Sequence, residues 1–282
     1  MKTVISEFNR GVDDFHFHHT LSPKGEYNLA KLGTESHQQF EILYLIKGEI
    51  KYLIEGEEYV VNEGDVIFVS PNQIHSIDVS PQKDYERIVV MFDLETVEKM
   101  LALGGMSLNK DVFSDTSCYR VIPHTILQKT GIIKRLLSFS DYKKHSLGHI
   151  FMLTGILNLI MELDSVFSEF EKGYAPVRVD NVVKSAVSYI NKNICNPLTL
   201  NEICAHLFVS KSTLCHRFVK TMRISVNRYV AIKKIHHASR LIRQGMGAVE
   251  AGLAVGYKQY TTFYHNYKQI MGVSPTDNKQ NV

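Results

Sequence analysis

The sequence predicts a two-domain α+β protein in which an antiparallel β-barrel followed by helices precedes an all-α domain. Three observations predict it: short strand-like runs between residues 40 and 92, a helical periodicity after residue 94, and two similar helix pairs in the last hundred residues. At 282 residues the chain is long enough for two domains that each bury a core. Its 44% hydrophobic and 22% charged residues are typical of a folded globular protein.

The first predicted element is the barrel. The strand-like runs are EILYLI, EIKYLI, EYVV, DVIFV and ERIVVMF. Turn-forming residues separate them, at Lys47-Gly48, Glu55-Gly56 and Asn62-Glu63-Gly64-Asp65. Regularly spaced short strands with tight turns predict a small antiparallel barrel or jelly roll over about residues 10–93.

Helices are predicted next, over about residues 94–171. Two segments, roughly 129–145 and 148–171, place apolar residues at intervals of three and four. These residues are Ile132, Leu136 and Phe139 in the first segment and Leu153, Leu157, Ile160 and Leu163 in the second. Each apolar stripe must pack on something, and the barrel, the other helix and a second subunit are all candidates.

The net charge of +3 conceals a division along the chain. Residues 1–176 contain 17 Lys and Arg against 25 Asp and Glu, whereas residues 177–282 contain 15 against 4. Net charges of −8 and +11 suggest a nucleic-acid-binding module attached to an acidic partner domain. KGYAPVR at 172–178 lies where the sign changes and is the expected linker, so we place the domains at 1–171 and 179–282.

A helix pair opens the basic part. Thr199 followed three residues later by Glu202 is a capping box, which predicts a helix start. Ser210 can cap a second helix through its hydroxyl. In that helix Leu214 and Phe218 share one face and are expected to point inward. This is helix-turn-helix spacing, although two ordinary packed helices would have the same local pattern.

The arrangement recurs 49 residues later. Leu214, Phe218, Ile224 and Ser225 have counterparts at Phe263, Tyr267, Val273 and Ser274. GAVEAGLAVGY at 247–257 supplies the matching first helix. Two unrelated helix pairs have no reason to share this spacing, so the repeat favours two helix-turn-helix units.

A linker helix is predicted over residues 226–243, between the two units. At about 1.5 Å per residue it measures about 27 Å, which can hold two recognition helices near one DNA turn apart, about 34 Å. Outward residues near the N-terminal ends of the recognition helices would read bases, and nearby lysines would contact phosphate. The DNA-binding candidates are Lys211, Ser212, Cys215 and His216, then Tyr260, Thr261, Tyr264, His265 and Lys268.

These residues resemble the DNA-binding domain of the AraC/XylS family of transcriptional regulators. The matching text is SKSTLCHRF, KIHHASRLI and GYKQYTTFYHNYKQIMGVSP, which ends in Ser274-Pro275. The run from His37 to His75 also resembles the family's cupin-like sensor domain. The resemblance implies ligand sensing by the barrel, dimerisation through the following helices and transcription control, as an activator, at promoters. The implied partners are promoter DNA, RNA polymerase and a small-molecule effector, for which a sugar or another polar metabolite would suit.

The chain departs from the family pattern at several positions. Arg223 stands where the family usually has Gly, and Lys234 stands where the linker motif usually begins with Arg. Ala251-Gly252 replaces the usual Ile-Ala, which predicts a less stable second unit because a helical Gly costs about 1 kcal/mol. His216 and His265 stand where many relatives use Arg, so the target sequence cannot be transferred from them.

Four residues of the barrel are candidate metal ligands and raise the possibility of an enzyme. Glu35, His37, Glu41 and His75 fall where a metal-binding cupin would place its ligands, and carboxylate–imidazole sets suit Fe, Mn or Zn. We expect them instead to be hydrogen-bonded residues of a ligand-binding pocket, with no bound metal or cofactor. FHFHHT at 15–20 holds three histidines, but a polar start to a strand explains them equally well.

Compartment signals favour the cytoplasm. No secretion signal is recognisable, and the cysteines at 118, 195, 204 and 215 lack CxxC spacing, so reduced thiols are expected. The apolar stretch at 150–161 is short of the roughly 20 residues that span a bilayer and reads as a buried helix.

The sequence thus favours a dimeric DNA-binding regulator and not an enzyme. A metal-dependent cupin enzyme and a barrel that serves only for dimerisation stay as alternatives.

Overall fold

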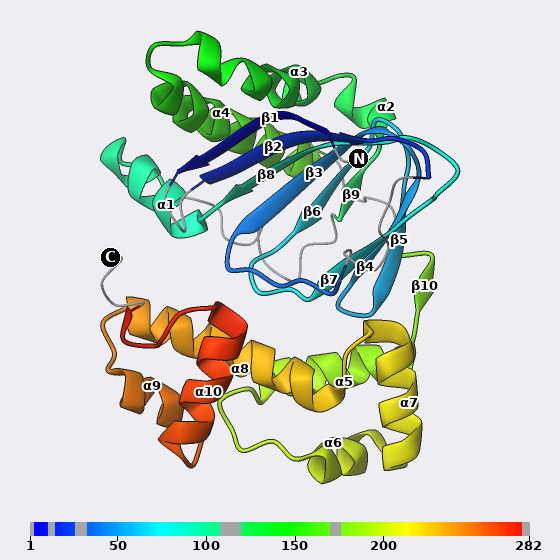
Figure 1. The fold of residues 1–282 in the computed structure, drawn as a ribbon, viewed down its shortest axis with the longest axis vertical. Helices are drawn as coiled ribbons and strands as arrows, with labels where there is room; N and C mark the ends of the chain where they lie inside the picture. The colour runs from blue at the N-terminus through cyan, green and yellow to red at the C-terminus, as the bar shows by residue number, and fades with distance from the viewer. Residues whose placement is uncertain (1–2, 11–14, 26–32, 108–119, 170–175, 278–282) are drawn as a thin grey trace. The chain divides into compact units, whose positions relative to one another are not determined.

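The computed structural model describes residues 3–10, 15–25, 33–107, 120–169 and 176–277 and divides into two compact units (Figure 1). The β unit comprises Met1–Ile54 with Glu58–Arg178, and the helical unit comprises Val179–Val282 with Glu55–Glu57. Part of the predicted linker, 172–175, lies outside the described residues. An antiparallel β domain followed by a helical domain confirms the coarse two-domain α+β prediction.

Ten strands form two sheets in the described part of the chain. They are β1 (Thr3–Arg10), β2 (Phe15–Ser22), β3 (Phe40–Lys47), β4 (Ile50–Ile54), β5 (Glu57–Val61), β6 (Val66–Val69), β7 (His75–Val79), β8 (Tyr85–Phe92), β9 (Val121–Ile122) and β10 (Arg178–Val179). One sheet has the order β1-β2-β8-β3-β6-β9 and the other β10-β5-β4-β7. Because these strands make two separate sheets, the barrel or jelly roll predicted from sequence is present as two antiparallel sheets and is not a closed barrel.

Strand β3 explains why the sheets separate. Every residue from Phe40 to Leu45 is buried, so both faces of the strand are covered. Ile42 and Tyr44 pack with the helices, whereas Leu43 and Leu45 pack between the sheets. The chain then leaves this sheet at Gly48, whose φ of +112° favours glycine and whose Cβ would lie 2.8 Å from a backbone oxygen. A two-sided strand of this kind requires three layers: helices, sheet and second sheet.

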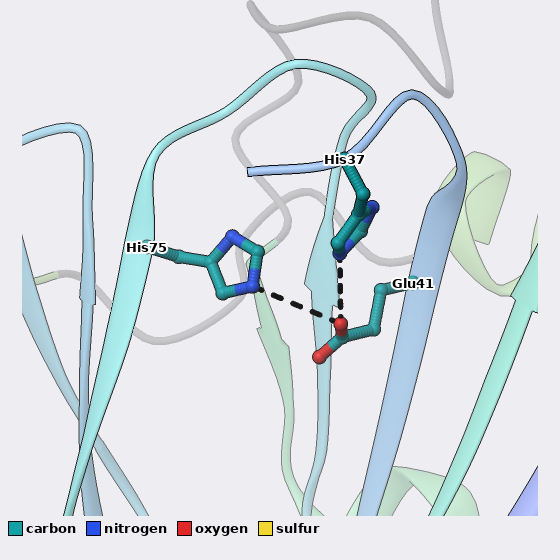
Figure 2. Close-up of side chains that lie close together, drawn as sticks. All are labelled: His37, Glu41 and His75. Carbon is teal, nitrogen blue, oxygen red and sulfur yellow. Dashed lines mark hydrogen bonds and ion pairs between the residues drawn. The ribbon is translucent and has the colours of Figure 1, made fainter. Parts of the chain in front are cut away.

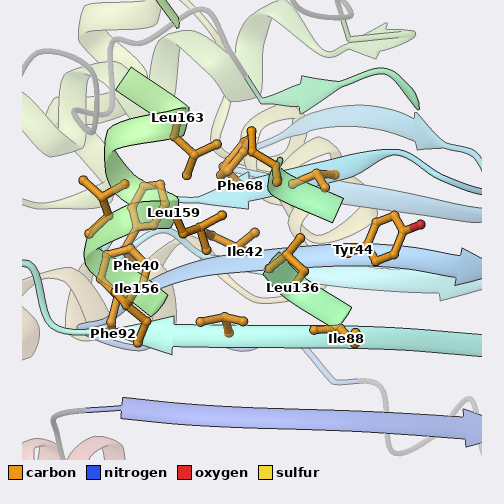
Figure 3. Packing of buried hydrophobic residues seen from close by; sticks show 14 of the residues in the cluster. Phe40, Ile42, Tyr44, Phe68, Ile88, Phe92, Leu136, Ile156, Leu159 and Leu163 are labelled. Atoms are coloured by element: carbon orange, nitrogen blue, oxygen red, sulfur yellow. The ribbon is translucent and has the colours of Figure 1, made fainter. Parts of the chain in front are cut away.

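Helices cover the outer face of the six-stranded sheet (Figure 1). They are α1 (Leu94–Leu103), α2 (His124–Leu127), α3 (Ile132–Ser138), the 3-10 helix η2 (Phe139–Lys144) and α4 (Gly148–Glu169). Figure 3 shows Leu136 of α3 and Ile156, Leu159 and Leu163 of α4 against the sheet's aromatic residues. The sheet therefore buries the first predicted stripe together with Ile160 and Leu163 of the second, whereas Leu153 and Leu157 are only partly buried.

Helix α4 is longer than the apolar stretch predicted from sequence and is buried on one face only. Gly148–Phe167 is apolar enough, with a mean hydropathy of 1.7, to span a membrane by length and composition, and 39% of that window is buried. One such helix is weak evidence for a membrane span, since a core helix passes the same test. Ile150 and Met161 are 53% and 62% exposed, so the outer face is unusually apolar.

The described part of the helical unit has six helices, of which the first was not predicted from the sequence and the other five were. They are α5 (Asn181–Lys192), α6 (Leu200–Leu207), α7 (Lys211–Met222), α8 (Val226–Arg243), α9 (Ala248–Ala254) and α10 (Tyr260–Met271). The Thr199–Glu202 capping box is present at the start of α6, and the Ser210 hydroxyl accepts the Thr213 amide at the start of α7. Helix α8 occupies the range predicted for the linker helix.

The repeat extends to the helix ends. Helices α7 and α10 begin and end 49 residues apart, and the inward residues Leu214, Phe218, Phe263 and Tyr267 are all fully buried. Each helix closes on a left-handed residue, Arg223 at φ 60° and Gly272 at φ 75°. Arg223 therefore occupies a conformation that favours glycine, which is the residue the family pattern has there.

Gly252 has a packing role that the sequence did not reveal. A Cβ on this residue of α9 would lie 3.0 Å from ring carbons of Phe263. The aromatic ring occupies the space that the missing side chain leaves, and both residues are buried. The loss of helix propensity at Gly252 is thus offset by closer packing between α9 and α10.

Candidate functional site

The candidate nucleic-acid interface is the outward face of α7 and α10. Its residues are Lys211, Ser212, Cys215 and His216 on α7, and Tyr260, Thr261, Tyr264, His265 and Lys268 on α10. All nine are exposed except Cys215 and Tyr264, which are partly exposed. Ser212 and His216 are equivalent to Thr261 and His265 in the 49-residue repeat, so each helix presents a hydroxyl and an imidazole at the same positions. The two lysines are not equivalent, because Lys211 corresponds to Tyr260 and Lys268 to Val219.

Aromatic packing holds the second of these helices. Phe263 lies between the rings of Tyr257 and Tyr267, with centroids 5.5 Å away in each case and edge-to-face geometry. Tyr260 lies 5.8 Å from the same ring. In the first unit, Phe218 packs edge-to-face on Tyr229 of α8 at 5.5 Å. Such contacts orient α7 and α10 so that their outward faces are set by the core.

Arg217 anchors α7 through a contact that sequence reasoning missed. Its guanidinium donates to both carboxylate oxygens of Asp180 at 2.9 Å, and Asp180 also caps α5 through the amides of Val182 and Val183. Burial alone would raise the pKa of the Asp180 carboxyl, but the bonds from Arg217 and the amides bring that pKa below its ordinary value. Arg217 is therefore committed to structure, although it lies on the recognition helix.

Lys234 joins both helix-turn-helix units to α8. Its ammonium is buried and donates to the carbonyl oxygens of Asn196, at 2.9 Å, and Val255, at 2.6 Å. Asn196 precedes α6 and Val255 follows α9, so one side chain contacts the segments next to both first helices. Gly256 makes room for this contact, because a Cβ there would lie 2.9 Å from the ammonium.

The candidate site in the β unit lies between the two sheets. Glu41 is on β3 and shares its inter-sheet face with Leu43 and Leu45, because alternate residues of a strand point the same way. His75 begins β7 of the other sheet, and His37 precedes β3. Figure 2 shows the three side chains pointing toward one another. Their potential ligand atoms all lie within 4.8 Å of one another.

Distances within this cluster are short. His37 Nε2 lies 3.0 Å from Glu41 Oε2, and His75 Nε2 lies 3.8 Å from the same oxygen (Figure 2). The other oxygen, Oε1, accepts a hydrogen bond from the Tyr52 hydroxyl at 2.6 Å. Glu41 and His75 are 6% and 3% exposed, so water reaches neither side chain freely.

Burial and pairing set the ionisation of these groups. Burial alone would raise the pKa of Glu41, but the His37 hydrogen bond holds that pKa well below its usual range. Burial would lower the pKa of His37, and the Glu41 carboxylate more than reverses this, so the net shift is upward. For His75 burial dominates and its pKa is lowered, which keeps the ring neutral at neutral pH.

Glu35, the fourth predicted residue, lies beside the cluster. Its backbone pairs with that of His75, with N–H to O distances of 2.8 and 3.0 Å. A cavity of about 40 Å³ adjoins the two residues. It is lined by Gly33, Glu35, His75, Ser76, Ile77 and Arg87. Sequence reasoning missed Arg87, which lies over the Tyr85 ring at 4.6 Å and brings a positive charge to the cavity.

The histidines at 15–20 lie on β2 and form a different arrangement. His19 Nε2 lies 2.9 Å from Glu86 Oε1, and its Nδ1 lies 3.2 Å from the Ser140 hydroxyl. Among residues with described positions, the one group of three His, Cys, Asp or Glu side chains close enough to share a metal ion is His37, Glu41 and His75. The β2 histidines have no such group around them in the described structure.

Comparison with known proteins defines the class of protein. A model of the AraC-like ligand binding domain matches residues 26–127, and a model of a helix-turn-helix domain matches residues 203–281. With both models matched in this order, the chain is similar in these two regions to AraC-like transcriptional regulators.

Several curated relatives and solved structures are similar. The HTH-type transcriptional regulator YdiP of Escherichia coli is 30% identical over 38% of this chain and 35% of its own length. The lactose operon transcription activator of Staphylococcus xylosus is 22% identical over 57% of this chain and 60% of its own. The match with an AraC-like regulator of Streptomyces antibioticus spans 42% of that relative. Fatty-acid-bound ToxT of Vibrio cholerae aligns over 98% of both chains at 12% identity and a TM-score of 0.38.

Proposed function

We propose that this protein is a sequence-specific DNA-binding regulator of transcription whose β unit senses a small-molecule effector. The observation that carries the proposal is the pair of exposed, equivalent faces on α7 and α10 within a segment of net charge +11. Buried aromatic and aliphatic residues orient both helices, and the side chains left outward can donate to bases and phosphates.

Helix α8 supports binding to one face of a duplex. Its 18 residues measure about 27 Å at about 1.5 Å per residue, close to the roughly 34 Å that separates successive major grooves. In this proposal Ser212, His216, Thr261 and His265 meet base edges. Lys211, the first residue of α7, and Lys268, in the last turn of α10, contact phosphate.

A salt series on the full-length chain tests the proposal. Binding to promoter DNA should weaken steeply as salt rises, because Lys and Arg displace condensed counterions. Lys211→Ala or Lys268→Ala should weaken binding to all sequences alike and reduce the slope of log K against log salt by about one. Thr262→Ala, at an exposed position that is not among the proposed contact residues, is the control. Binding that shows no preference for any duplex, even at low salt, contradicts the proposal.

The remaining partners follow from the family and the described surfaces. The effector would enter the β unit near the cavity lined by Glu35 and Arg87, where a polar metabolite such as a sugar would find hydrogen-bonding groups. A promoter-bound regulator of this family would act with RNA polymerase, as an activator and in the cytoplasm. We further propose that the chain forms a homodimer through the apolar outer face of α4.

The dimer proposal can be tested on that face. Ile150 and Met161 are more than half exposed, and Leu153 and Leu157 lie partly exposed between them. Met161→Glu should raise the dimer dissociation constant by at least about 100-fold, because a symmetric interface would bury two unpaired carboxylates. Sedimentation equilibrium measures the change, and Leu103→Glu, at a 91% exposed position of α1, is the matched control. A wild-type chain that sediments as a monomer at high concentration rules out the dimer.

The alternative, a metal-dependent cupin enzyme carrying a basic helical domain, has one observation in its favour: the convergence of His37, Glu41 and His75. An enzyme of this kind would need none of the repeated outward residues on α7 and α10. Glu41→Ala and His75→Ala would abolish turnover in an enzyme, whereas in a regulator they should alter the effector response and leave DNA binding intact.

A further inference from the structure

The turn between α6 and α7 holds a phenylalanine in a backbone conformation that favours glycine. Phe208 has φ 55° and ψ 40°, in the left-handed region. Its amide donates to the carbonyl oxygen of Ala205 at 3.4 Å, and the Val209 amide donates to that of Cys204 at 3.1 Å. These two bonds close the end of α6 and require a left-handed residue at this position. The backbone gains nothing there from a large side chain, since glycine adopts the conformation without steric cost.

The Phe208 side chain is also almost fully exposed. At 95% it is the most exposed large apolar side chain in the described part of the chain. The left-handed conformation costs free energy for any residue with a Cβ, and an apolar ring in water contributes no burial in return. Residues kept in such a conformation cluster at functional sites. Packing within the helical unit therefore does not account for a phenylalanine at this position.

The second helix-turn-helix unit shows that the repeat does not require this arrangement. Its left-handed residue is Gly256, at φ 78°, three residues before the cap of α10 at Gln259. The aromatic residue 49 positions after Phe208 is Tyr257, whose ring packs edge-to-face on Phe263 at 5.5 Å. An aromatic ring at the same place in the repeat is thus used for packing in one unit and left in solvent in the other.

Phe208 lies next to the end of α7 that would enter the DNA groove first. Ser210, two residues further on, caps α7. Two residues span at most about 7 Å, so the Phe208 backbone stays close to the exposed Lys211 and Ser212. The segment 177–282 has a net charge of +11, which makes a DNA duplex the partner that this surface suits. The apolar group that the major groove presents is the thymine methyl.

We propose that Phe208 packs against the methyl group of a thymine at the edge of the groove that α7 enters. The inference rests on the proposed function, because it adds a specificity-determining residue to the same interface. Apolar contact with a thymine methyl reads a base without any hydrogen bond from the side chain. It gives the first unit a preference for thymine that the second unit lacks at the equivalent position, where Tyr257 is packed on Phe263.

Removal of the methyl group from the DNA tests the contact. Duplexes that the full-length wild-type chain selects from a random-sequence pool are remade with deoxyuridine in place of each thymine in turn, and binding is measured by competition. At one thymine the change should weaken wild-type binding about 4-fold, which corresponds to the roughly 0.8 kcal/mol of one buried methylene. Phe208→Asn should bind the unmodified duplex at least about 4-fold more weakly and should not respond to deoxyuridine at that thymine.

A stability measurement on the same variant separates recognition from structure. Asparagine tolerates the left-handed conformation, so Phe208→Asn should raise the melting temperature of the helical unit by roughly 2–4 °C while it weakens DNA binding. A residue that only supports the fold would not change stability and affinity in opposite directions. Arg223→Gly is the matched control, because it replaces the left-handed residue at the other end of α7. It should keep the wild-type response to deoxyuridine.

Each outcome decides the assignment. Loss of the deoxyuridine response in Phe208→Asn but not in Arg223→Gly supports it. An unchanged response in Phe208→Asn, or a wild type that responds at no thymine, overturns it. Equal affinity of Phe208→Asn and the wild type for every duplex also overturns it and indicates a protein partner for the exposed ring. Phe208→Gly takes the place of the asparagine variant if that variant does not fold. A wild type that selects no duplex contradicts the proposed function itself, whereas selection without the thymine response contradicts this inference alone.

Discussion

Replacing His216 or Thr261 by alanine is expected to relax base preference at single base pairs by about 1–3 kcal/mol, which is about 5- to 150-fold. Both side chains are exposed on the outward faces of α7 and α10, near the N-terminal ends that would enter the groove first. Neither contributes to the buried core, so the variants should fold normally. Selection of bound duplexes from a random-sequence pool, followed by position-by-position competition, measures the change.

Controls for this result lie on the same helices. Thr262→Ala makes the same chemical change one residue away, at an exposed position of α10 that is not among the proposed base-reading residues. It should leave base preference unchanged. The salt slope of His216→Ala and Thr261→Ala should also stay near that of the wild type, because neither residue is expected to contact phosphate. A double His216→Ala, His265→Ala variant with intact preference would place the reading surface elsewhere.

Lys234→Met is expected to reduce the free energy of unfolding of the helical unit by about 2–4 kcal/mol. The change removes two hydrogen bonds from a charged donor and leaves the carbonyl oxygens of Asn196 and Val255 without that donor. Burial lowers the pKa of the Lys234 ammonium, because removing the charge from water has a free-energy cost. This cost offsets part of the stabilisation that the two hydrogen bonds provide. Urea unfolding, followed by helical circular dichroism, measures the loss.

Lys220→Met separates this effect from the general loss of a lysine. Lys220 is an exposed residue of α7, and its replacement should change stability by less than about 0.5 kcal/mol. Because Lys234 contacts the segments next to both α6 and α9, its loss should also weaken binding at both half-sites. If the urea unfolding midpoint of Lys234→Met equals that of the wild type, the buried ammonium does not stabilise the unit as described.

Local signals in the sequence determined most of the helical unit. The Thr199–Glu202 capping box, the Ser210 cap and the 49-residue repeat each depend on residues close together in the chain, and each predicts a helix start or face directly. Helix α8 lies at the predicted range for the same reason. Short apolar runs and turn residues likewise identified β3, β4, β5, β6 and β8, whereas β1, β7, β9 and β10 were not among the predicted runs. The nucleic-acid candidates follow from helical periodicity alone, so they could be chosen without the fold.

Tertiary packing decided what local signals could not. Two sheets form in place of a closed barrel because β3 is buried on both faces, and strand alternation does not say which neighbour covers each face. Likewise, the partners of Arg217 and Lys234 lie in segments distant along the chain, so their anchoring contacts have no sequence signature. The sequence by itself determined that His37, Glu41 and His75 could be ligands. Only the packing of β3 against β7 brought His75 Nε2 to the Glu41 carboxylate and left it without a donor, because that meeting depends on how the two sheets face each other.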